Sequence, residues 1–457
     1  MQSSASDLRR PITSPINNNL TETVMTITRS QFLRASLLAG AGMSLSPPMR
    51  ALASTGKLTG NVTFLTYESL PSTKKVIGEL IASLEAANPG LKINPLFTSP
   101  EAVRKQVSSM LQSGSAPDIV NLDIEDAVLY SQGNLLEPIN DIAKSLPQSW
   151  RVSLNNNEYF IPNGVKFTYS WYRADLLERA GIAPPKTWVE FEAAAAKLTG
   201  NGQYGCVINS NSSGDNPVSA LFSYAVSNGV NFFDDNGKLV FDQGANRERL
   251  KETLAFLKRM SKFSPSGSNF TWAEVMNSFA SGKVAMADYI GARFYSVLKQ
   301  NNPELAKVTK PFRQPYGRAP ANRLSAEGYM VFKGSKNKEV SKAIIQYLRE
   351  GQRLNEFLWS IPLHVLPVSK ETFLGPYQSD EYVKSNPEIV RVISDVWNES
   401  RNPVFELDGK RLRWERAKIY TSTIYNKMLA SVVQGDTAPD AAIDQAAKAA
   451  RAMLKNT

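Results

Sequence analysis

The feature of this sequence that most constrains its fold is an alternation of strand-like and helix-like stretches. Residues 61–67, 91–93 and 119–122 are rich in apolar and β-branched residues and are typical of strands. Between them, apolar residues recur at the three- and four-residue spacing of an amphipathic helix. Strands joined by helices favour parallel pairing with right-handed crossovers. The pattern therefore predicts the α/β class with a doubly wound sheet.

The ends of these strands are the first place to expect a binding site. In a doubly wound sheet, ligands lie outside the carboxyl ends of the strands. Tyr67 and Glu68 end the first predicted strand, and Asp123 follows the third. The fold class alone thus predicts that these three residues contact a ligand.

Residues 1–53 have the order of an export signal. Arg29 and Arg34 precede or begin an apolar run at 35–45, and small residues mark a cleavage position near Ala53. The run is too short and too rich in glycine to span a membrane. The alternative is a buried helix of the fold, but the charge, the apolar run and the cleavage position come in the order that is typical of a signal.

Two details of this signal leave alternatives open. Ser30 stands where a twin-arginine signal has its second arginine, so the export route is either the Sec route or a degenerate twin-arginine route. Residues 1–24 are polar, and a signal that began at Met25 would begin in the usual way. We therefore expect residues 1–24 to be either outside the translated chain or disordered.

The cysteine content bears on where the protein acts. Cys206 is the only cysteine, so no disulfide can form within the chain, and it is too far from the signal to be a lipid anchor. It lies in a strand-like run, where we expect a buried thiol. An exported chain with no anchor would diffuse away from a cell with one membrane. We therefore expect a monomer in the periplasm of a two-membrane bacterium.

The net charge of +10 is compatible with a nucleic acid, an anionic lipid or an anionic ligand as partner. The sequence has no block of Lys and Arg residues with interleaved aromatic residues. Export argues further against a nucleic-acid partner, and we expect none.

The stretch 159–188 is the most informative single part of the chain. An aromatic strand at 166–172 runs into a short helix, and the Pro-Pro turn at 184–185 leads to Thr187, which can cap the next helix. Several further motifs occur in a fixed order along the chain. They are Leu-Glu-Ala-Ala-Asn-Pro-Gly at 84–90, Ser-Gly-Ser-Ala-Pro-Asp-Ile-Val at 113–120, Asn-Gly-Val-Asn-Phe at 228–232, Phe-Ala-Ser-Gly-Lys-Val-Ala-Met at 279–286, Leu-Pro-Val at 366–368 and Gly-Asp-Thr-Ala-Pro-Asp-Ala-Ala at 435–442.

Together, these motifs resemble those of the extracellular solute-binding proteins of ABC importers, family 1, which includes maltose-binding protein. The resemblance covers nearly all of the chain after the signal. It implies a two-lobed periplasmic-binding-protein fold, with a doubly wound sheet in each lobe and a hinge of two or three crossovers. Lobe I would comprise 54–165 and 311–366, and lobe II would comprise 166–310 and 367–457.

Enzymatic chemistry has little support in the sequence. The chain has one histidine, His364, and lacks the Gly-x-Ser-x-Gly elbow of a serine hydrolase. One histidine and one cysteine exclude a His/Cys zinc site, and we expect no metal and no cofactor. The acidic residues Asp123, Glu125 and Asp126 could suggest a glycosidase, but we interpret them as the solvated start of a helix.

A sugar-binding cleft combines flat apolar faces with fixed polar groups. Of Trp171 and Tyr172, which alternate on a strand, one should face the core. Trp272 begins a helix after a break and is a candidate for the cleft. His364 either supports the structure or touches the ligand near a predicted crossover.

Two departures from the family pattern suggest a charged ligand. Lys166 stands where the family often has a polar or acidic residue, and Arg293 stands where the resemblance implies a tryptophan that stacks on sugar. The alternative is that the alignment slips by one residue and Phe294 stacks instead. An Arg fork binds a carboxylate or phosphate with two hydrogen bonds, so we hypothesise that the ligand carries such a group.

The full set of predicted ligand-binding residues follows from these arguments and from the resemblance. It comprises Tyr67, Glu68, Asp123, Lys166, Trp171, Tyr224, Trp272, Asp288, Arg293, Glu327, Gly328 and His364.

The predicted function is that of a periplasmic protein without enzymatic activity. It would capture a sugar, an oligosaccharide or a sugar or polyol derivative by closing its two lobes, and deliver it to the membrane subunits of an ABC permease. Two alternatives stay open: a secreted carbohydrate-active enzyme, and a binder of another solute such as a polyamine or a peptide. A polyamine site needs several acids, and the basic net charge argues mildly against it.

Overall fold

The computed structural model describes residues 57–144, 146, 151, 153–154, 156–265, 270–404 and 413–455. The predicted export signal lies outside the described residues. The described residues all belong to one unit of the chain, Thr55–Thr457. Among them, no helix combines the length and the apolar character that crossing a membrane requires.

Strands and helices alternate along most of the chain, as the sequence predicts. The strands are β1 (Gly60–Thr66), β2 (Leu91–Phe97), β3 (Ile119–Asp123), β4 (Ser153–Leu154), β5 (Asn157–Glu158), β6 (Ile161–Arg173), β7 (Tyr204–Val207), β8 (Val284–Ile290), β9 (Thr309–Phe312), β10 (Asn322–Val331) and β11 (Ser400–Arg401).

The helices cover both halves of the chain. Those before β10 are α3 (Pro71–Ala87), α4 (Pro100–Gln112), α5 (Ile124–Gln132), α6 (Asn140–Ala143), α7 (Ala174–Ala180), α8 (Trp188–Lys197), α9 (Asp215–Ser227), α10 (Gly244–Met260), α11 (Trp272–Ala280), α12 (Arg293–Asn301) and α13 (Pro303–Lys307). Those after β10 are α14 (Lys338–Arg349), α15 (Gln352–Ser360), α16 (Lys370–Leu374), α17 (Glu381–Lys384), α18 (Pro387–Val396), α19 (Trp414–Tyr420), α20 (Ile424–Val433) and α21 (Pro439–Lys455). Short 3₁₀ helices span Ser261–Phe263 and Pro376–Ser379.

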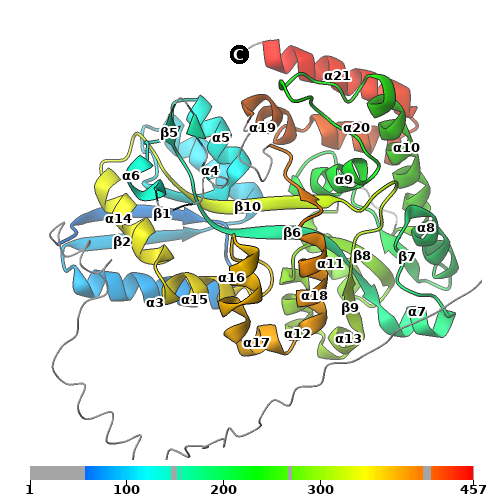
Figure 1. Ribbon diagram of the computed structural model, residues 1–457, viewed down its shortest axis with the longest axis horizontal. Helices are drawn as coiled ribbons and strands as arrows, with labels where there is room; N and C mark the ends of the chain where they lie inside the picture. Colours follow the sequence, from blue (N-terminus) through cyan, green and yellow to red (C-terminus); the bar gives the residue numbers. More distant parts are fainter. Residues whose placement is uncertain are drawn as a thin grey trace, which may run out of the picture. The chain divides into compact units, whose positions relative to one another are not determined.

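Nine of the described strands form one mixed sheet with the order β2-β1-β3-β10-β6-β8-β7, to which β9 is added on β6 and β11 on β10, while β4 and β5 form a separate two-stranded sheet. β1 pairs in parallel with β2 and β3, and β7 pairs in parallel with β8, as helical crossovers require. Figure 1 shows α3 and α15 on one side of β1 and β2, and α4 and α5 on the other. The predicted doubly wound α/β arrangement is confirmed.

Two long antiparallel strands, β6 and β10, connect the two ends of the sheet (Figure 1). The first half of β6 pairs with β10, and its second half pairs with β8 and β9. The segment before Pro367 joins this crossing, since Val165 and Leu366 exchange two backbone hydrogen bonds of 2.9 Å. The chain thus passes between the two ends of the sheet near the predicted crossing points, although the lobe boundaries themselves stay a prediction.

The turn that follows α7 contains the helix cap that the sequence predicts at Thr187. The Thr187 hydroxyl accepts a hydrogen bond from the Glu190 amide at 3.3 Å, and the Glu190 carboxylate accepts one from the Thr187 amide, which forms a capping box. Trp188 stacks on Phe256 with ring centroids 4.3 Å apart, so this tryptophan is structural. Cys206 is fully buried, as predicted.

Gly328 lies at a close backbone approach between β10 and β6. The register of the pair shifts between Glu327 and Gly328, and a Cβ on Gly328 would lie 2.2 Å from the carbonyl oxygen of Ile161. Gly328 therefore allows the two crossing strands to meet. In this structure its surroundings are the backbone of β6.

We expect Gly328→Ala to destabilise the fold by about 1–3 kcal/mol, because its methyl group would force the crossing strands apart. Gly78→Ala is the matched control, since it lies within α3 and nothing lies within 4 Å of its Cβ position. The control should stabilise the protein by about 0.5–1 kcal/mol. Urea denaturation measures both, and equal effects of the two variants would contradict the close approach.

Candidate functional site

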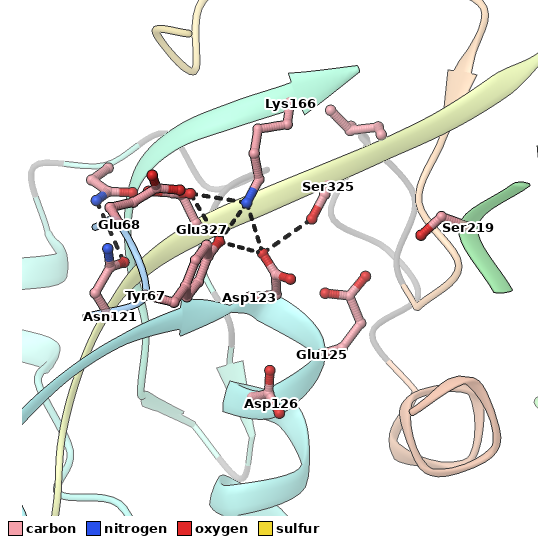
Figure 2. A network of polar contacts seen from close by, with 12 residues as sticks. Tyr67, Glu68, Asn121, Asp123, Glu125, Asp126, Lys166, Ser219, Ser325 and Glu327 are labelled. Atoms are coloured by element: carbon pink, nitrogen blue, oxygen red, sulfur yellow. Dashed lines mark hydrogen bonds and ion pairs between the residues drawn. The ribbon is translucent and has the colours of Figure 1, made fainter. Parts of the chain in front are cut away.

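A buried polar network lies where β1 and β3 end against the crossing strands β6 and β10. Six of its members, shown in Figure 2, are Tyr67, Glu68, Asp123, Lys166, Ser325 and Glu327. Arg293 joins it through Glu68. We call these seven residues the polar network. The sequence predicted all of them except Ser325 as ligand-binding residues.

Lys166 is the centre of this network. Its side chain is 6% exposed, and its ammonium lies 2.9 Å from Glu327 Oε2 and 3.2 Å from Asp123 Oδ1. It also donates to the Tyr67 hydroxyl. Burial alone would lower the pKa of Lys166. The nearby Asp123 and Glu327 carboxylates raise this pKa by more than burial lowers it, so the pKa is raised overall and the ammonium stays charged.

Two of the groups around the ammonium, Tyr67 and Asp123, have shifted pKa values. The Tyr67 hydroxyl lies 2.9 Å from Asp123 Oδ1 and 2.8 Å from Glu327 Oε2, and burial together with these carboxylates raises the pKa of Tyr67. Burial favours protonation of Asp123, but Lys166 and Arg323 outweigh it and lower its pKa to about 2. Tyr67 is therefore a neutral donor and Asp123 an ionised acceptor.

A further ion pair lies within the network, and two more lie beside it. Arg293, the first residue of α12, donates to Glu68, which follows β1. Arg323 lies 3.3 Å from Glu125, and Arg104 binds both oxygens of Asp126 at 2.7 and 2.9 Å.

The expectation of a solvated helix start is therefore wrong for two of its three acids. Glu125 and Asp126 do lie in the first turn of α5, but they are 1% and 2% exposed. Buried carboxylates require partners, and Arg323 and Arg104 provide them.

A second polar cluster surrounds Asp288 on β8. Its carboxylate accepts hydrogen bonds from Ser170, from Tyr224 and, at 3.2 Å, from Gln314. Burial raises the pKa of Asp288 despite these hydrogen bonds. Two predicted site residues, Tyr224 and Asp288, thus contact each other, in a cluster separate from the contacts of Lys166.

The two tryptophans among the predicted site residues lie elsewhere. Trp171 is fully buried and stacks on Phe294 and Tyr295, with centroids 5.5 and 5.4 Å away. Phe294 is therefore in the core, while Arg293 beside it enters the polar network. Trp272 begins α11 with a partly exposed side chain.

His364 is buried next to the network without being part of it. It is 3% exposed, and a Cβ on Gly291 would lie 2.2 Å from its Nδ1 atom. Gly291 has a φ of 70°, which favours glycine, and it precedes Arg293 by two residues. The His364 ring thus packs against the turn that places Arg293.

A hollow of about 1040 Å³ lies between the turn after α9, the loop before β10 and the segment around β11, and its described lining does not include the seven residues of the polar network. Its lining combines carboxylates, amides and guanidinium groups with aromatic rings. Among the lining residues are Asn231, Phe233, Asp234, Asp235, Asn246, Arg401, Asn402 and Arg416. We call this the hinge-side hollow.

Asn402 connects the hinge-side hollow to the charged residues beside the network. Its amide lines the hollow, lies 3.4 Å from Glu125 Oε1 and donates to the Leu324 carbonyl at 3.0 Å. None of the lining residues of the hollow is among the ligand-binding residues predicted from the sequence. The Asn-Gly-Val-Asn-Phe motif at 228–232 was the one available signal for this region.

The raised pKa values of two buried acids predict a fall in stability as the pH rises toward neutrality. Burial raises the pKa of Glu68 and of Glu125 to about 7, from an ordinary value of 4.5. Between about pH 5 and 7, the folded protein therefore holds protons that the unfolded chain has released, and the free energy of unfolding falls by up to about 1.4 kcal/mol per pH unit for each proton.

Glu68→Gln removes one of these protons and should flatten the dependence on pH. Denaturant midpoints over this range measure it, with Glu192→Gln, which changes an exposed ion pair with Arg259, as the control. An unchanged pH dependence in Glu68→Gln would show that Glu68 is ionised in the folded protein.

Comparison with known proteins shows the family to which the chain belongs. The sequence profile of the family described as bacterial extracellular solute-binding protein matches residues 67–350. An ABC transporter periplasmic-binding protein of Escherichia coli strain K12 is 23% identical over 349 residues, which cover 70% of this chain and 78% of that protein.

Solved structures share the fold. A solute-binding protein of Thermotoga lettingae with bound α-D-tagatose superposes with a TM-score of 0.73 at 19% identity, covering 87% of this chain and 100% of that one. A solute-binding protein of Agrobacterium vitis with bound D-mannitol gives a TM-score of 0.69 at 20% identity, covering 87% and 98%.

Proposed function

The chain belongs to the bacterial extracellular solute-binding proteins, and we propose from this premise that it is the solute-binding subunit of an ABC importer for a sugar or polyol. The observation that carries the proposal is the polar network at the carboxyl ends of β1 and β3, together with a hollow of about 1040 Å³ that Asn402 links to Glu125, the acid two residues after Asp123. Fixed carboxylates, amides and a tyrosine hydroxyl next to an open volume can hold a polyhydroxylated ligand in one orientation. The proteins with bound tagatose and mannitol that share this fold support the same ligand class.

The proposed mechanism is closure of two lobes around the ligand. β6 and β10 cross between the two ends of the sheet, which makes them the natural hinge. Elements from the two ends meet beyond this crossing, since Glu68 after β1 pairs with Arg293 after β8 and α5 packs against α19. A ligand that binds the closed form more tightly shifts the population toward it. No covalent chemistry is needed, so we propose a binding protein and not an enzyme.

The last step of the proposed function is delivery of the ligand to the permease. The closed, ligand-loaded form would be the one presented to the membrane subunits of the permease, and the chain would act as a monomer in the periplasm. The anionic ligand predicted from Lys166 and Arg293 is one of the ligand classes that the first experiment has to separate.

The first experiment is a thermal-shift screen of the purified protein. The panel holds mannitol, tagatose, maltose, trehalose and glucosylglycerol, with mannitol 1-phosphate and glucuronate for the anionic class, and putrescine and a tripeptide for the alternative solutes. A ligand at 100 times its dissociation constant adds about 2.7 kcal/mol to the free energy of unfolding, which raises the melting temperature visibly. We expect a shift with a sugar or polyol that is recovered unchanged after incubation.

Other outcomes of the screen would contradict the proposal. A shift only with putrescine or the peptide would move the chain to another solute class. A sugar that raised the melting temperature and was then consumed would indicate an enzyme.

Closure can be tested at the ion pair between Glu68 and Arg293. Arg293→Met leaves the Glu68 carboxylate buried without its cation, and this destabilises the closed form. We expect the dissociation constant of the ligand found in the screen to rise by about tenfold or more, as measured by calorimetry. Arg259→Met is the control, because it changes an exposed ion pair with Glu192. Unchanged affinity in Arg293→Met would show that this pair does not contribute to closure.

A further inference from the structure

We infer that the hinge-side hollow binds the sugar units of the ligand, and that the ligand is therefore an oligosaccharide of two or more units and not a free hexose or hexitol. This inference rests on the proposed function and names its ligand class more narrowly. It also places the main contact surface of the ligand outside the residues that the sequence predicts.

The polar network itself offers little surface to a ligand. Glu68 and Glu327 are 0% exposed, and the Lys166 side chain between the carboxylates is 6% exposed. None of the seven network residues lines the hinge-side hollow. A solute needs an open volume that is bordered by apolar and polar groups, and the hollow provides such a volume.

The size of the hollow indicates the size of its ligand. Small-molecule pockets have volumes of about 300–1,000 Å³ and enclose most of the surface of a drug-sized ligand. The hinge-side hollow, with about 1040 Å³, lies at the upper end of this range. A single hexose or hexitol is smaller than a drug-sized molecule and would leave much of this volume to water. Two or more linked sugar units would fill it.

The lining provides both kinds of surface that a chain of sugar units requires. Its apolar part includes the rings of Phe222 and Phe233, which are 7% and 8% exposed. Its polar part includes the exposed residues Asn231, Asn236 and Arg401. Apolar surface can cover the C–H faces of sugar rings, while amide and guanidinium groups can form hydrogen bonds with sugar hydroxyl groups.

These exposed polar side chains have hydrogen-bonding groups to spare. At Asn231 and Asn236 the backbone amide makes a hydrogen bond, whereas the side-chain amide has no hydrogen-bond partner among the described residues. Arg401 donates one hydrogen bond to a described residue, to the Ser400 carbonyl at 3.1 Å. Each of the three side chains can therefore bind a hydroxyl group without breaking a contact of the fold.

The turn that carries the two amides is held in place by the fold. Asn246 Oδ1 accepts a hydrogen bond from the Asn231 amide at 2.9 Å, and Asp234 Oδ1 accepts one from the Asn236 amide at 2.9 Å. Arg416 of α19 donates to the Asp234 carbonyl at 3.0 Å. Because this lining is ordered in advance, binding costs it little conformational freedom.

The position of the hollow couples its occupancy to the proposed closure. Residues 319–321 line it directly before β10, and β11, from the same lining, pairs with the first two residues of β10. Arg416 contributes to the lining from α19, and α19 packs against α5 at the other end of the sheet. A ligand in the hollow therefore contacts segments that are attached to the hinge and to this packing, and it can stabilise the closed form.

The first test compares sugars that differ in the number of their units. The series are glucose, maltose and maltotriose; xylose, xylobiose and xylotriose; and mannose, mannobiose and mannotriose, with mannitol and tagatose as further single-unit members. Calorimetry on the purified wild-type protein measures each dissociation constant. We expect the best sugar of two or three units to bind at least about tenfold more tightly than any single-unit member.

Two outcomes would overturn the inference in different ways. A single-unit sugar or polyol that binds within about tenfold of the best longer sugar, or more tightly, would refute the inference and leave the proposed function intact. If no sugar or polyol of the series binds, the proposed function itself fails, and the inference fails with it.

A filling variant tests whether the longer sugar binds in the hollow. Ala319 lines the hollow and is exposed, so Ala319→Trp fills part of its volume. We expect the affinity for the best oligosaccharide to fall by at least about tenfold. Ala193→Trp is the matched control, because Ala193 is an exposed alanine on α8 that lines a different hollow of about 480 Å³. The control should leave the affinity unchanged.

Arg401→Ala is a second variant that adds no bulk. It removes a donor from the lining, so we expect the same oligosaccharide to bind about fivefold more weakly. The melting temperature of each variant, measured without ligand, separates loss of fold from loss of binding, and Arg401→Ala decides if Ala319→Trp does not fold. Unchanged affinity in the folded variants would overturn the assignment of the ligand to the hollow.

Discussion

The buried ammonium of Lys166 is the constraint on which the centre of this structure depends. A charged group that is 6% exposed is tolerated only with close partners, and Lys166 finds them in Asp123, Glu327 and Tyr67. These partners come from β3, β10 and the end of β1, whereas Lys166 lies on β6. The same contacts that stabilise the ammonium therefore fix the ends of β1 and β3 against the middle of β6 and β10. The position of the proposed site is a consequence of this arrangement.

The sequence predicted the part of the site that depends on local pattern. Alternating strands and helices implied parallel β1, β2 and β3, and the rule for strand ends then identified Tyr67, Glu68 and Asp123. The strand β10, which pairs with β3 and carries Glu327, was harder to place from the sequence. Glu327 meets Asp123 because β10 pairs antiparallel with β3, some 200 residues later in the chain, and its register with β6 shifts at Gly328. No local pattern encodes a pairing or a register shift of this kind.

The aromatic residues could not be placed from the sequence for a related reason. β6 is buried at every position from Ile161 to Trp171, so alternation along it does not distinguish a core face from a ligand face. Trp171 lies in the core. At the start of α12, Arg293 enters the polar network and Phe294 packs in the core. The hinge-side hollow was missed because its lining comes from loops that are far apart in the sequence and meet only through the fold.

The pairing of charges also explains why cations in a site do not by themselves imply an anionic ligand. Lys166 and Arg293 suggested such a ligand as long as their carboxylate partners were unknown. Once Glu68, Asp123 and Glu327 are placed beside them, each of these two cations has a carboxylate partner within the same network. Arg293 thereby links α12 to the end of β1 through Glu68, so this ion pair contributes to the fold as well as to the proposed closure. An anionic ligand that took up either cation would have to displace a carboxylate that is already buried there, and such a carboxylate has lost its hydration.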